Sequence, residues 1–145
     1  MTENEQRALG LLGLARRANR LSPGEEPTVI ACRAGKARLV LLAQDAGEHT
    51  VRRVRAMCRE KPPYLITAFT REELGNALGM TACALLAVDD AAFALRAAEL
   101  LGAESTHPEI VALLREQTEH DKKRRDEQKA HRNNIRRGKK RAPKA

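Results

Sequence analysis

Few residues in this chain have the types and spacing that catalysis requires. The four histidines are scattered, and the last three lie in or beside a basic C-terminal segment (His49, His107, His120 and His131). General acid–base catalysis needs a titratable side chain within hydrogen-bond reach of its partner. His49 follows Glu48, but such a polar pair is typical of the first turn of a helix. No nucleophile stands in a pattern with a base, so the sequence predicts a protein that is not an enzyme.

Two acidic pairs could bind a metal ion, but each also suits a helix start. Asp89-Asp90 follows an apolar run, where an aspartate caps the next helix. Glu25-Glu26 fits a first helical turn, where carboxylates complement the helix dipole. The chain has no GxGxxG or Walker pattern for phosphates. We therefore expect neither a metal site nor a cofactor.

Positive charge is concentrated at the C-terminus. Residues 1–104 hold 14 Lys and Arg against 13 Asp and Glu, whereas residues 105–145 hold 13 against 6. A near-neutral body with a cationic tail favours a polyanionic partner, nucleic acid before a membrane surface. A solvated tail that only keeps the protein soluble is the alternative. From residue 129 onward the chain has basic residues and no acidic one (Lys129, Arg132, Arg136, Arg137, Lys139, Lys140, Arg141 and Lys144).

Hydrophobic periodicity and capping residues predict an α/β fold. Helices are expected over residues 2–19, 25–34, 45–59, 70–78 and 90–101, and strands over 39–43, 64–69 and 84–88. Strands that alternate with helices indicate a three-layer α/β/α sandwich with the sheet in the middle. We expect the folded domain to span residues 1–102. Residues 103–145 form a basic tail, helical or disordered, with an apolar stripe only in its first turns (Ile110, Val111, Leu113 and Leu114).

The cysteines and the N-terminus indicate a cytoplasmic protein. Cys32, Cys58 and Cys83 lie about 25 residues apart, without disulfide or metal-ligand spacing. We expect them to be small apolar core residues in a reducing cytosol. The start of the chain is polar and acidic, unlike a signal peptide, and no apolar run reaches the roughly 18 residues of a membrane span.

Several segments, in order and spacing, resemble one family. They are residues 11–18 (LLGLARRA), 24–26 (GEE), 35–46 (GKARLVLLAQDA), 69–79 (FTREELGNALG) and 87–89 (AVD). Over about residues 6–101 they are similar to the ribosomal-protein family of kink-turn RNA binders (the L-seven-Ae / L-thirty-e type), and within it to a small bacterial branch, the YlxQ type. The resemblance implies a mixed four-stranded sheet, with a short fourth strand around Leu21.

The resemblance also implies where RNA would be bound. In the family, RNA is met at the start of the second helix and by the loop after the ELGxAxG segment. Backbone N–H groups at a helix start face phosphates, and polar side chains there read base edges. Gly24 matches the family pattern. Glu26 and Pro27 stand where the family has Asn and Glu, Ile30 stands for Lys, and Pro23 replaces the preceding basic residue.

Two hypotheses follow. The first is a monomeric RNA-binding protein of translation or ribosome assembly, with the ribosome or translation factors as further partners. Its site residues would be Gly24, Glu25, Glu26, Lys36, Arg38, Arg71, Gly79, Met80, Thr81 and Ala82, together with the tail residues Lys129, Arg132, Arg136, Arg137, Lys139, Lys140 and Arg141. The second is a protein-interaction adaptor that kept the fold and lost kink-turn recognition. Clustering of Lys36, Arg38 and Arg71 beside Gly24 would favour the first, and their dispersal the second.

Overall fold

The computed structural model describes the backbone of residues 1–140 and the side chains of residues 1–137. Its helices are α1 (Glu3–Arg17), α2 (Glu25–Arg33), α3 (Glu48–Met57), α4 (Arg71–Leu78), α5 (Ala91–Leu100), α6 (Ala103–Thr106) and α7 (Pro108–Lys140). Its strands are β1 (Leu21–Pro23), β2 (Leu39–Leu42), β3 (Tyr64–Ile66) and β4 (Leu85–Val88). Every helix and strand that the sequence predicts in the body is present, including the short strand at Leu21.

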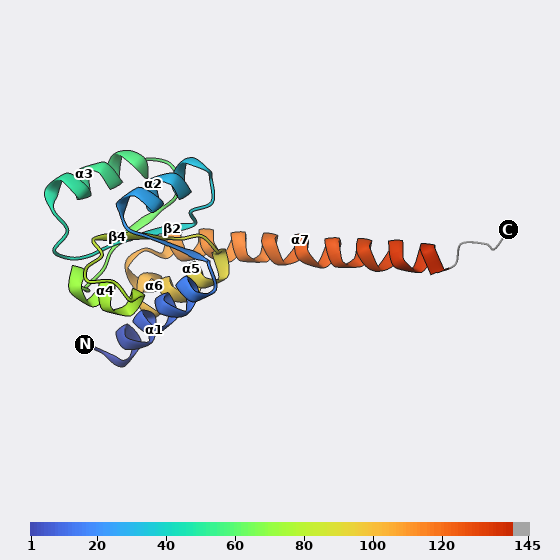
Figure 1. The fold of residues 1–145 in the computed structure, drawn as a ribbon, viewed down its shortest axis with the longest axis horizontal. Helices are drawn as coiled ribbons and strands as arrows, with labels where there is room; N and C mark the ends of the chain where they lie inside the picture. Colours follow the sequence, from blue (N-terminus) through green and yellow to red (C-terminus); the bar gives the residue numbers. More distant parts are fainter. Residues whose placement is uncertain (141–145) are drawn as a thin grey trace.

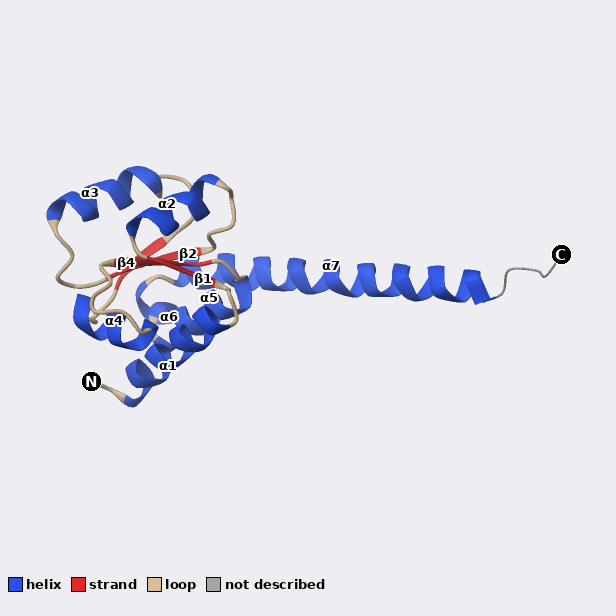
Figure 2. Cartoon of the chain, in the orientation of Figure 1, coloured by secondary structure: helices blue, strands red, loops and turns tan. Residues whose placement is uncertain are grey.

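The four strands form one mixed sheet in the order β1-β4-β2-β3. β4 runs antiparallel to both of its neighbours, and β2 and β3 are parallel. Helices α2 and α3 cover one face, and α1, α4, α5 and α6 lie on the other (Figures 1 and 2). This confirms the three-layer sandwich.

Each face of the sheet has its own apolar core, because successive residues of a strand point to opposite faces. On β2, Leu39 and Leu41 belong to the cluster under α1, α4 and α5, whereas Val40 and Leu42 belong to the one under α2 and α3. All four are fully buried, as expected of a strand covered on both sides.

The core continues past Gly102, where the sequence places the end of the folded domain. Ala103, Ile110, Val111 and Leu114 are buried in the larger cluster, so α6 and the first turns of α7 complete that face of the sheet. The apolar stripe expected in the first turns of the tail is therefore the anchor of α7. Beyond it, α7 continues as a straight helix that projects from the body (Figure 1).

Two of the three cysteines are core residues, as the sequence predicts. Cys58 and Cys83 are buried, whereas Cys32 is half-buried. Burial, together with a smaller effect of the nearby Cys32 thiol, raises the pKa of the Cys58 thiol to about 12. Burial likewise raises the pKa values of Cys83 and Cys32. These thiols therefore stay protonated in the native fold at neutral pH.

Candidate nucleic-acid interface

The start of α2 meets the loop that joins α4 to β4 (residues 79–84, here the α4–β4 loop). Gly24 is the N-cap of α2 with φ +95° and ψ 169°. Its N–H donates to the carbonyl of Leu85, the first residue of β4, over 2.9 Å. Because glycine has no side chain, it leaves the first-turn N–H groups of α2 uncapped. A helix start of this kind can accept an anion.

The α4–β4 loop is fixed against α4 by close backbone contacts. The N–H of Cys83 donates to the carbonyl of Arg71 over 2.9 Å, and that of Met80 donates to Gly75 over 2.7 Å. Gly79 ends α4 in the left-handed conformation, with φ +73°. A Cβ on Gly75 would lie 2.7 Å from Ala82 Cα, so only glycine allows this approach. Gly75 is thus a supporting residue that sequence reasoning left without a role.

The loop presents small side chains to solvent. Gly79, Thr81 and Ala82 are exposed, whereas Met80 packs against the larger core cluster. The end of the loop, after Cys83, leads into Leu85, to which Gly24 is hydrogen-bonded, whereas Met80 and Ala82 contact Gly75 of α4.

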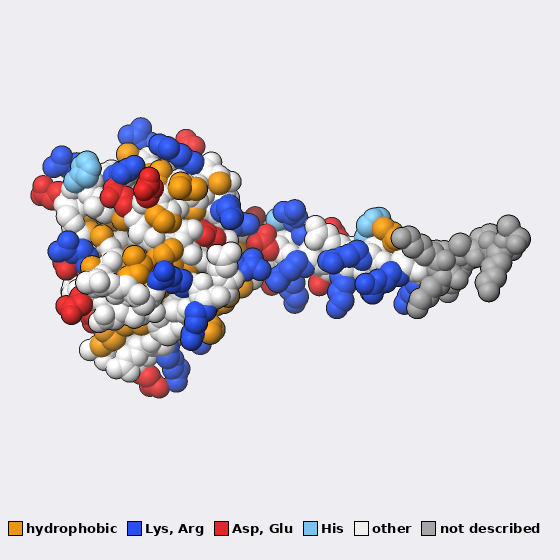
Figure 3. Space-filling view, viewed as in Figure 1, with side chains coloured by type: hydrophobic (Ala, Val, Ile, Leu, Met, Phe, Trp, Pro, Cys, Tyr) orange, Lys and Arg blue, Asp and Glu red, His pale blue; other side chains and the backbone are white. Residues whose placement is uncertain are grey.

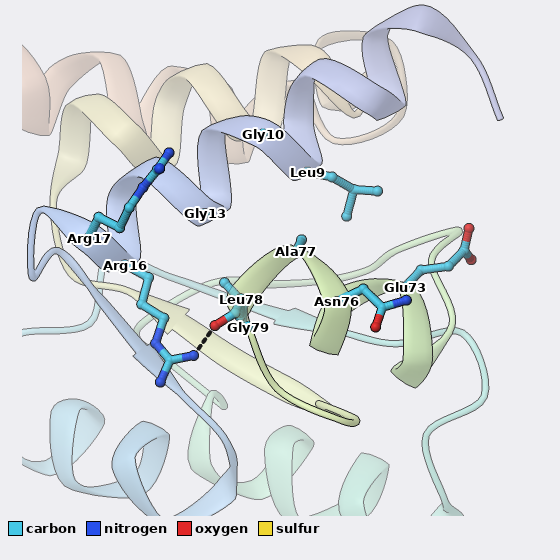
Figure 4. Close-up of a pocket in the computed structure, with 10 residues that line it drawn as sticks. All are labelled: Leu9, Gly10, Gly13, Arg16, Arg17, Glu73, Asn76, Ala77, Leu78 and Gly79. Atoms are coloured by element: carbon cyan, nitrogen blue, oxygen red, sulfur yellow. Dashed lines mark hydrogen bonds between the residues drawn. The ribbon is translucent and has the colours of Figure 1, made fainter.

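A groove between α1 and α4 borders this loop and brings two further arginines to it (Figure 4). It has a volume of about 720 Å³ and includes Gly79 among its lining residues. Gly13 lets the helices approach, since a Cβ there would lie 2.8 Å from the Ala77 carbonyl oxygen. Arg16 donates to the carbonyl of Leu78 at the C-terminus of α4, where the helix dipole favours a cation. Arg16 and Arg17 belong to the segment that resembles the family, but sequence reasoning gave them no role at the site.

Charges beside Gly24 are mostly paired. The carboxylate of Glu25 accepts a hydrogen bond from the guanidinium of Arg53 on α3 over 2.8 Å. Glu26 is exposed, without a described ion pair within residues 1–137. Arg71 lies at the same end of the sheet, where its N–H donates to Asp45 Oδ1 over 2.8 Å and its side chain pairs with Oδ2 of the same residue at 3.6 Å. Arg53 therefore offsets one of the two carboxylates that phosphates would meet.

Lys36 and Arg38 do not lie beside Gly24. The N–H of Arg38 bonds to the carbonyl of Val88, at the end of β4 opposite to Leu85 and Gly24. Its guanidinium pairs with Asp121 of α7 at 3.4 Å. Lys36 is exposed in the turn that precedes Arg38. Lys36, Arg38 and Arg71 therefore do not form one cluster beside Gly24. β4 runs antiparallel to both β1 and β2, so the end of β1, where Gly24 lies, and the start of β2, where Arg38 lies, are at opposite ends of the sheet.

The tail residues lie on the exposed part of α7. Lys129, Arg132, Arg136 and Arg137 are exposed. Lys139 and Lys140 belong to the same helix, although their side chains are outside the described residues, and Arg141 lies beyond them altogether.

Asp89, Asp90 and His49 lie at helix starts or form hydrogen bonds that support the fold. Asp90 caps α5 by accepting the N–H of Phe93 over 3.0 Å, and Asp89 accepts the hydroxyl of Ser22 over 2.6 Å. His49 is exposed in the first turn of α3. Residues 1–137 contain no group of three metal-ligating side chains. None of the described helices is both long enough and apolar enough to cross a membrane.

The body of this chain matches a known protein family and several known proteins. The model of the ribosomal protein L7Ae/L30e/S12e/Gadd45 family matches residues 6–95. The RNA-binding protein YlxQ of Bacillus subtilis (strain 168) is 38% identical over 92 residues, which are 63% of this chain and 91% of that protein. The protein of the same name from Enterococcus faecium is 34% identical over 98 residues, 68% of this chain and 94% of that protein.

Solved structures show the same fold. A Bacillus halodurans protein of unknown function has a TM-score of 0.62 and 37% identity, over 66% of this chain and 97% of that one. A Giardia lamblia 15.5kD RNA binding protein superposes with a TM-score of 0.59 at 22% identity, over 78% of this chain and 92% of that one. The two bacterial relatives are named for RNA binding and not for an enzymatic activity. The chain belongs to the ribosomal protein L7Ae/L30e/S12e/Gadd45 family.

Proposed function

We propose that this chain is a non-catalytic, cytoplasmic RNA-binding protein that acts in translation or ribosome assembly. Structured RNA of the kink-turn type would be met by the α2-start surface, which we define as Gly24, Glu25, Glu26 and the α4–β4 loop. The observation that carries the proposal is the hydrogen bond between Gly24 and Leu85, which joins the family-like segment 24–26 to the residue that follows the α4–β4 loop, 61 positions later. The names of the YlxQ relatives support RNA as the ligand.

The physical basis is a helix start that can approach a phosphate closely. The uncapped N–H groups of α2 form the positive end of a helix dipole, and Gly24 presents no side chain that would hold a backbone away. Arg53 neutralises Glu25, so Glu26 is the main electrostatic obstacle. The exposed loop residues Thr81 and Ala82 could pack against an unstacked base beside that phosphate.

The second candidate is the adaptor that kept the fold and lost kink-turn recognition. The position of Lys36 and Arg38 at the far end of β4 favours it, because a strong kink-turn binder would gain from cations beside Gly24. In that case the α2-start surface would dock a protein, and RNA affinity would come from α7 alone.

Reversing the charge of Glu26 tests the first candidate without disturbing the core. In Glu26→Lys a phosphate about 8 Å away would gain about 1 kcal/mol in water, so we expect about fivefold tighter binding of a kink-turn RNA. The matched control is Glu109→Lys, which changes the same charge in the first turn of α7, near β3 at the other margin of the sheet. Fluorescence anisotropy with full-length protein at about 100 mM salt gives both affinities.

A gain confined to Glu26→Lys supports RNA contact at the α2-start surface. Equal gains in RNA affinity in both variants would show that binding follows net charge. No gain in either variant would favour the adaptor, in which the α2-start surface docks a protein.

A further inference from the structure

Four arginines from three separate segments line one cleft where α7 leaves the body. They are Arg20 after α1, Arg38 before β2, and Arg124 and Arg125 on α7. The cleft has a volume of about 290 Å³ and also contains Asp90 and Asp121. We call it the junction cleft. Figure 3 shows Lys and Arg side chains gathered around this point and along the underside of the projecting helix.

The charges of the junction cleft are not balanced within the described protein. Four guanidinium groups face two carboxylates, which leaves a formal net charge of +2. Asp121 pairs with Arg38 at 3.4 Å, and Asp90 is engaged in capping α5. Arg20, Arg124 and Arg125 form no salt bridge among residues 1–137. Like charges held together in this way are stabilised by a bound anion.

The cleft is held in place because the root of α7 is part of the core. Ile110, Val111 and Leu114 are buried, and Arg115 pairs with Glu104 at 3.1 Å and with Glu99 at 3.7 Å. The α7 arginines are therefore fixed relative to Arg20 and Arg38 instead of moving freely with a tail. A preorganised site loses less side-chain entropy on binding.

We propose that the junction cleft is a second binding site, for the phosphodiester backbone of an RNA duplex. The planar guanidinium forms paired hydrogen bonds to phosphate oxygens, which suits a cluster of arginines to this ligand. The inference rests on the proposed function for the identity of the polyanion, but it places the contact at the opposite end of β4 from Gly24. It gives Arg20 and Arg125 a role that the family pattern does not supply, and it places Arg38 with them and not beside Gly24.

The basic face of α7 continues the cleft outward. Lys122, Arg125, Lys129, Arg132 and Arg136 are spaced alternately by three and four residues, so they share one face of the helix. At 1.5 Å per residue this stripe is about 21 Å long. Glu127 lies on the opposite face of the helix, whereas Asp126 borders the stripe, four residues after Lys122 and three before Lys129. A straight row of cations matches the regular backbone of a duplex.

A duplex fits better than a single strand because the junction cleft and the part of α7 beyond Leu114, which we call the arm, lack aromatic rings. Single-stranded RNA is commonly held by stacking bases on aromatic side chains, and residues 108–145 contain no Phe, Tyr or Trp. The arm also lacks an apolar stripe beyond Leu114, as a membrane-surface helix or a coiled coil would require. The cleft and the arm would therefore contact RNA through its phosphates alone, and such contacts do not distinguish one base from another.

The test compares two double variants of the full-length chain that remove the same charge. Arg20→Gln with Arg125→Gln empties the junction cleft of two cations, and Arg55→Gln with Arg59→Gln removes two exposed cations of the α3 region. Binding of a plain RNA duplex is measured from about 50 to 200 mM salt. We expect the cleft variant to lose about two units of the slope of log K against log salt and about tenfold in affinity, since each phosphate contact contributes about one unit. The α3 variant should match the parent.

Equal losses in both variants, or none in the cleft variant, would overturn the proposal. Nuclear magnetic resonance of the Arg20 and Arg125 Nε–H groups separates the two sources of phosphate. We expect these resonances to shift with micromolar duplex and not with inorganic phosphate below about 10 mM, a weak-binding limit. Saturation by submillimolar phosphate without a duplex effect would reassign the cleft to a small anion.

The two proposals can fail separately. If Glu26→Lys gains no kink-turn affinity while the cleft variant loses duplex binding, the α2-start surface fails and the junction cleft stands. If Glu26→Lys gains kink-turn affinity and the cleft variant binds duplex like the parent, the α2-start surface stands and the junction cleft fails.

Discussion

Replacing Gly75 with alanine should separate the two effects that a glycine has in a helix. A Cβ at this position would lie 2.7 Å from both Cα and N of Ala82 and 2.9 Å from the carbonyl carbon of Thr81. Ordinary contacts between carbon atoms begin at about 3.5 Å, so the α4–β4 loop would have to move by about 0.8 Å. Such overpacking costs about 1–3 kcal/mol. Alanine also stabilises a helix interior by about 1 kcal/mol relative to glycine.

Gly10→Ala in α1 is the matched control, because its Cβ would meet nothing within 4 Å. Gly10→Ala gains only the higher helix propensity of alanine and should raise the free energy of unfolding by about 1 kcal/mol. Both variants gain this propensity, so Gly75→Ala should be less stable than Gly10→Ala by the overpacking cost alone, about 1–3 kcal/mol.

Urea denaturation with an unchanged slope m measures this difference. Because the loop moves, Gly75→Ala should also bind kink-turn RNA more weakly, while its affinity for a plain duplex stays that of the parent. If Gly75→Ala proves as stable as Gly10→Ala, the close approach of the loop to α4 is not as described, and the support that we assign to Gly75 is refuted.

Four further predictions concern the root of α7, its exposed part, the charge at Glu25 and the Cys58 thiol. Leu114→Ala should lower the free energy of unfolding by about 2–5 kcal/mol, and a melting temperature equal to that of the parent would show that Leu114 does not anchor α7. Deletion of residues 128–145 should leave thermal stability unchanged and flatten the salt dependence of RNA binding. Arg53→Gln should weaken kink-turn binding about threefold by exposing the Glu25 charge, and Glu25→Gln in the same chain should restore it; additive losses by anisotropy would exclude this coupling. Since the folded pKa of Cys58 is raised from 9.0 to about 12, its contribution to stability is complete below pH 9 and is lost as the pH rises toward 12, by about 1.4 kcal/mol per pH unit. Cys58→Ala should reduce the slope of the free energy of unfolding against pH in alkaline denaturation, leaving the part due to Cys32 and Cys83, and an unchanged slope would exclude a contribution of Cys58.

The sequence predicts most of the fold because its signals are local. Buried strands appear as continuous apolar runs such as residues 39–42, and Thr70 with Glu73 forms the capping box that opens α4. The boundaries shift where side chains compete with the backbone. α3 begins at Glu48 with Gly47 as its N-cap and not near Asp45, whose side chain instead accepts the N–H of Arg71 at the start of α4.

The structure brings only some of the predicted site residues to one end of the sheet, because the positions of the others depend on long-range strand pairing. The sequence places Gly24 and the α4–β4 loop at the site through the family pattern. It cannot place Lys36 and Arg38, whose distance from Gly24 is set by the strand order and the direction of β4. The Glu25–Arg53 pair joins residues 28 apart, and neither position alone signals the other.

The apolar stripe at Ile110, Val111 and Leu114 is visible in the sequence, but its partner surface is not. That surface forms only when α5 and the sheet are packed together. The junction cleft has the same origin, since it unites three segments that carry no shared motif.

The most direct test of the central claim is a titration of the full-length protein against a labelled kink-turn RNA and a plain duplex, at low and near-physiological salt. The two phosphate-contacting surfaces that we propose at opposite ends of β4 predict that both RNAs bind at low salt, and that the kink-turn RNA keeps the tighter binding as salt rises. Equal affinities that fall together with salt would contradict recognition at the α2-start surface and leave RNA binding to the cationic arm.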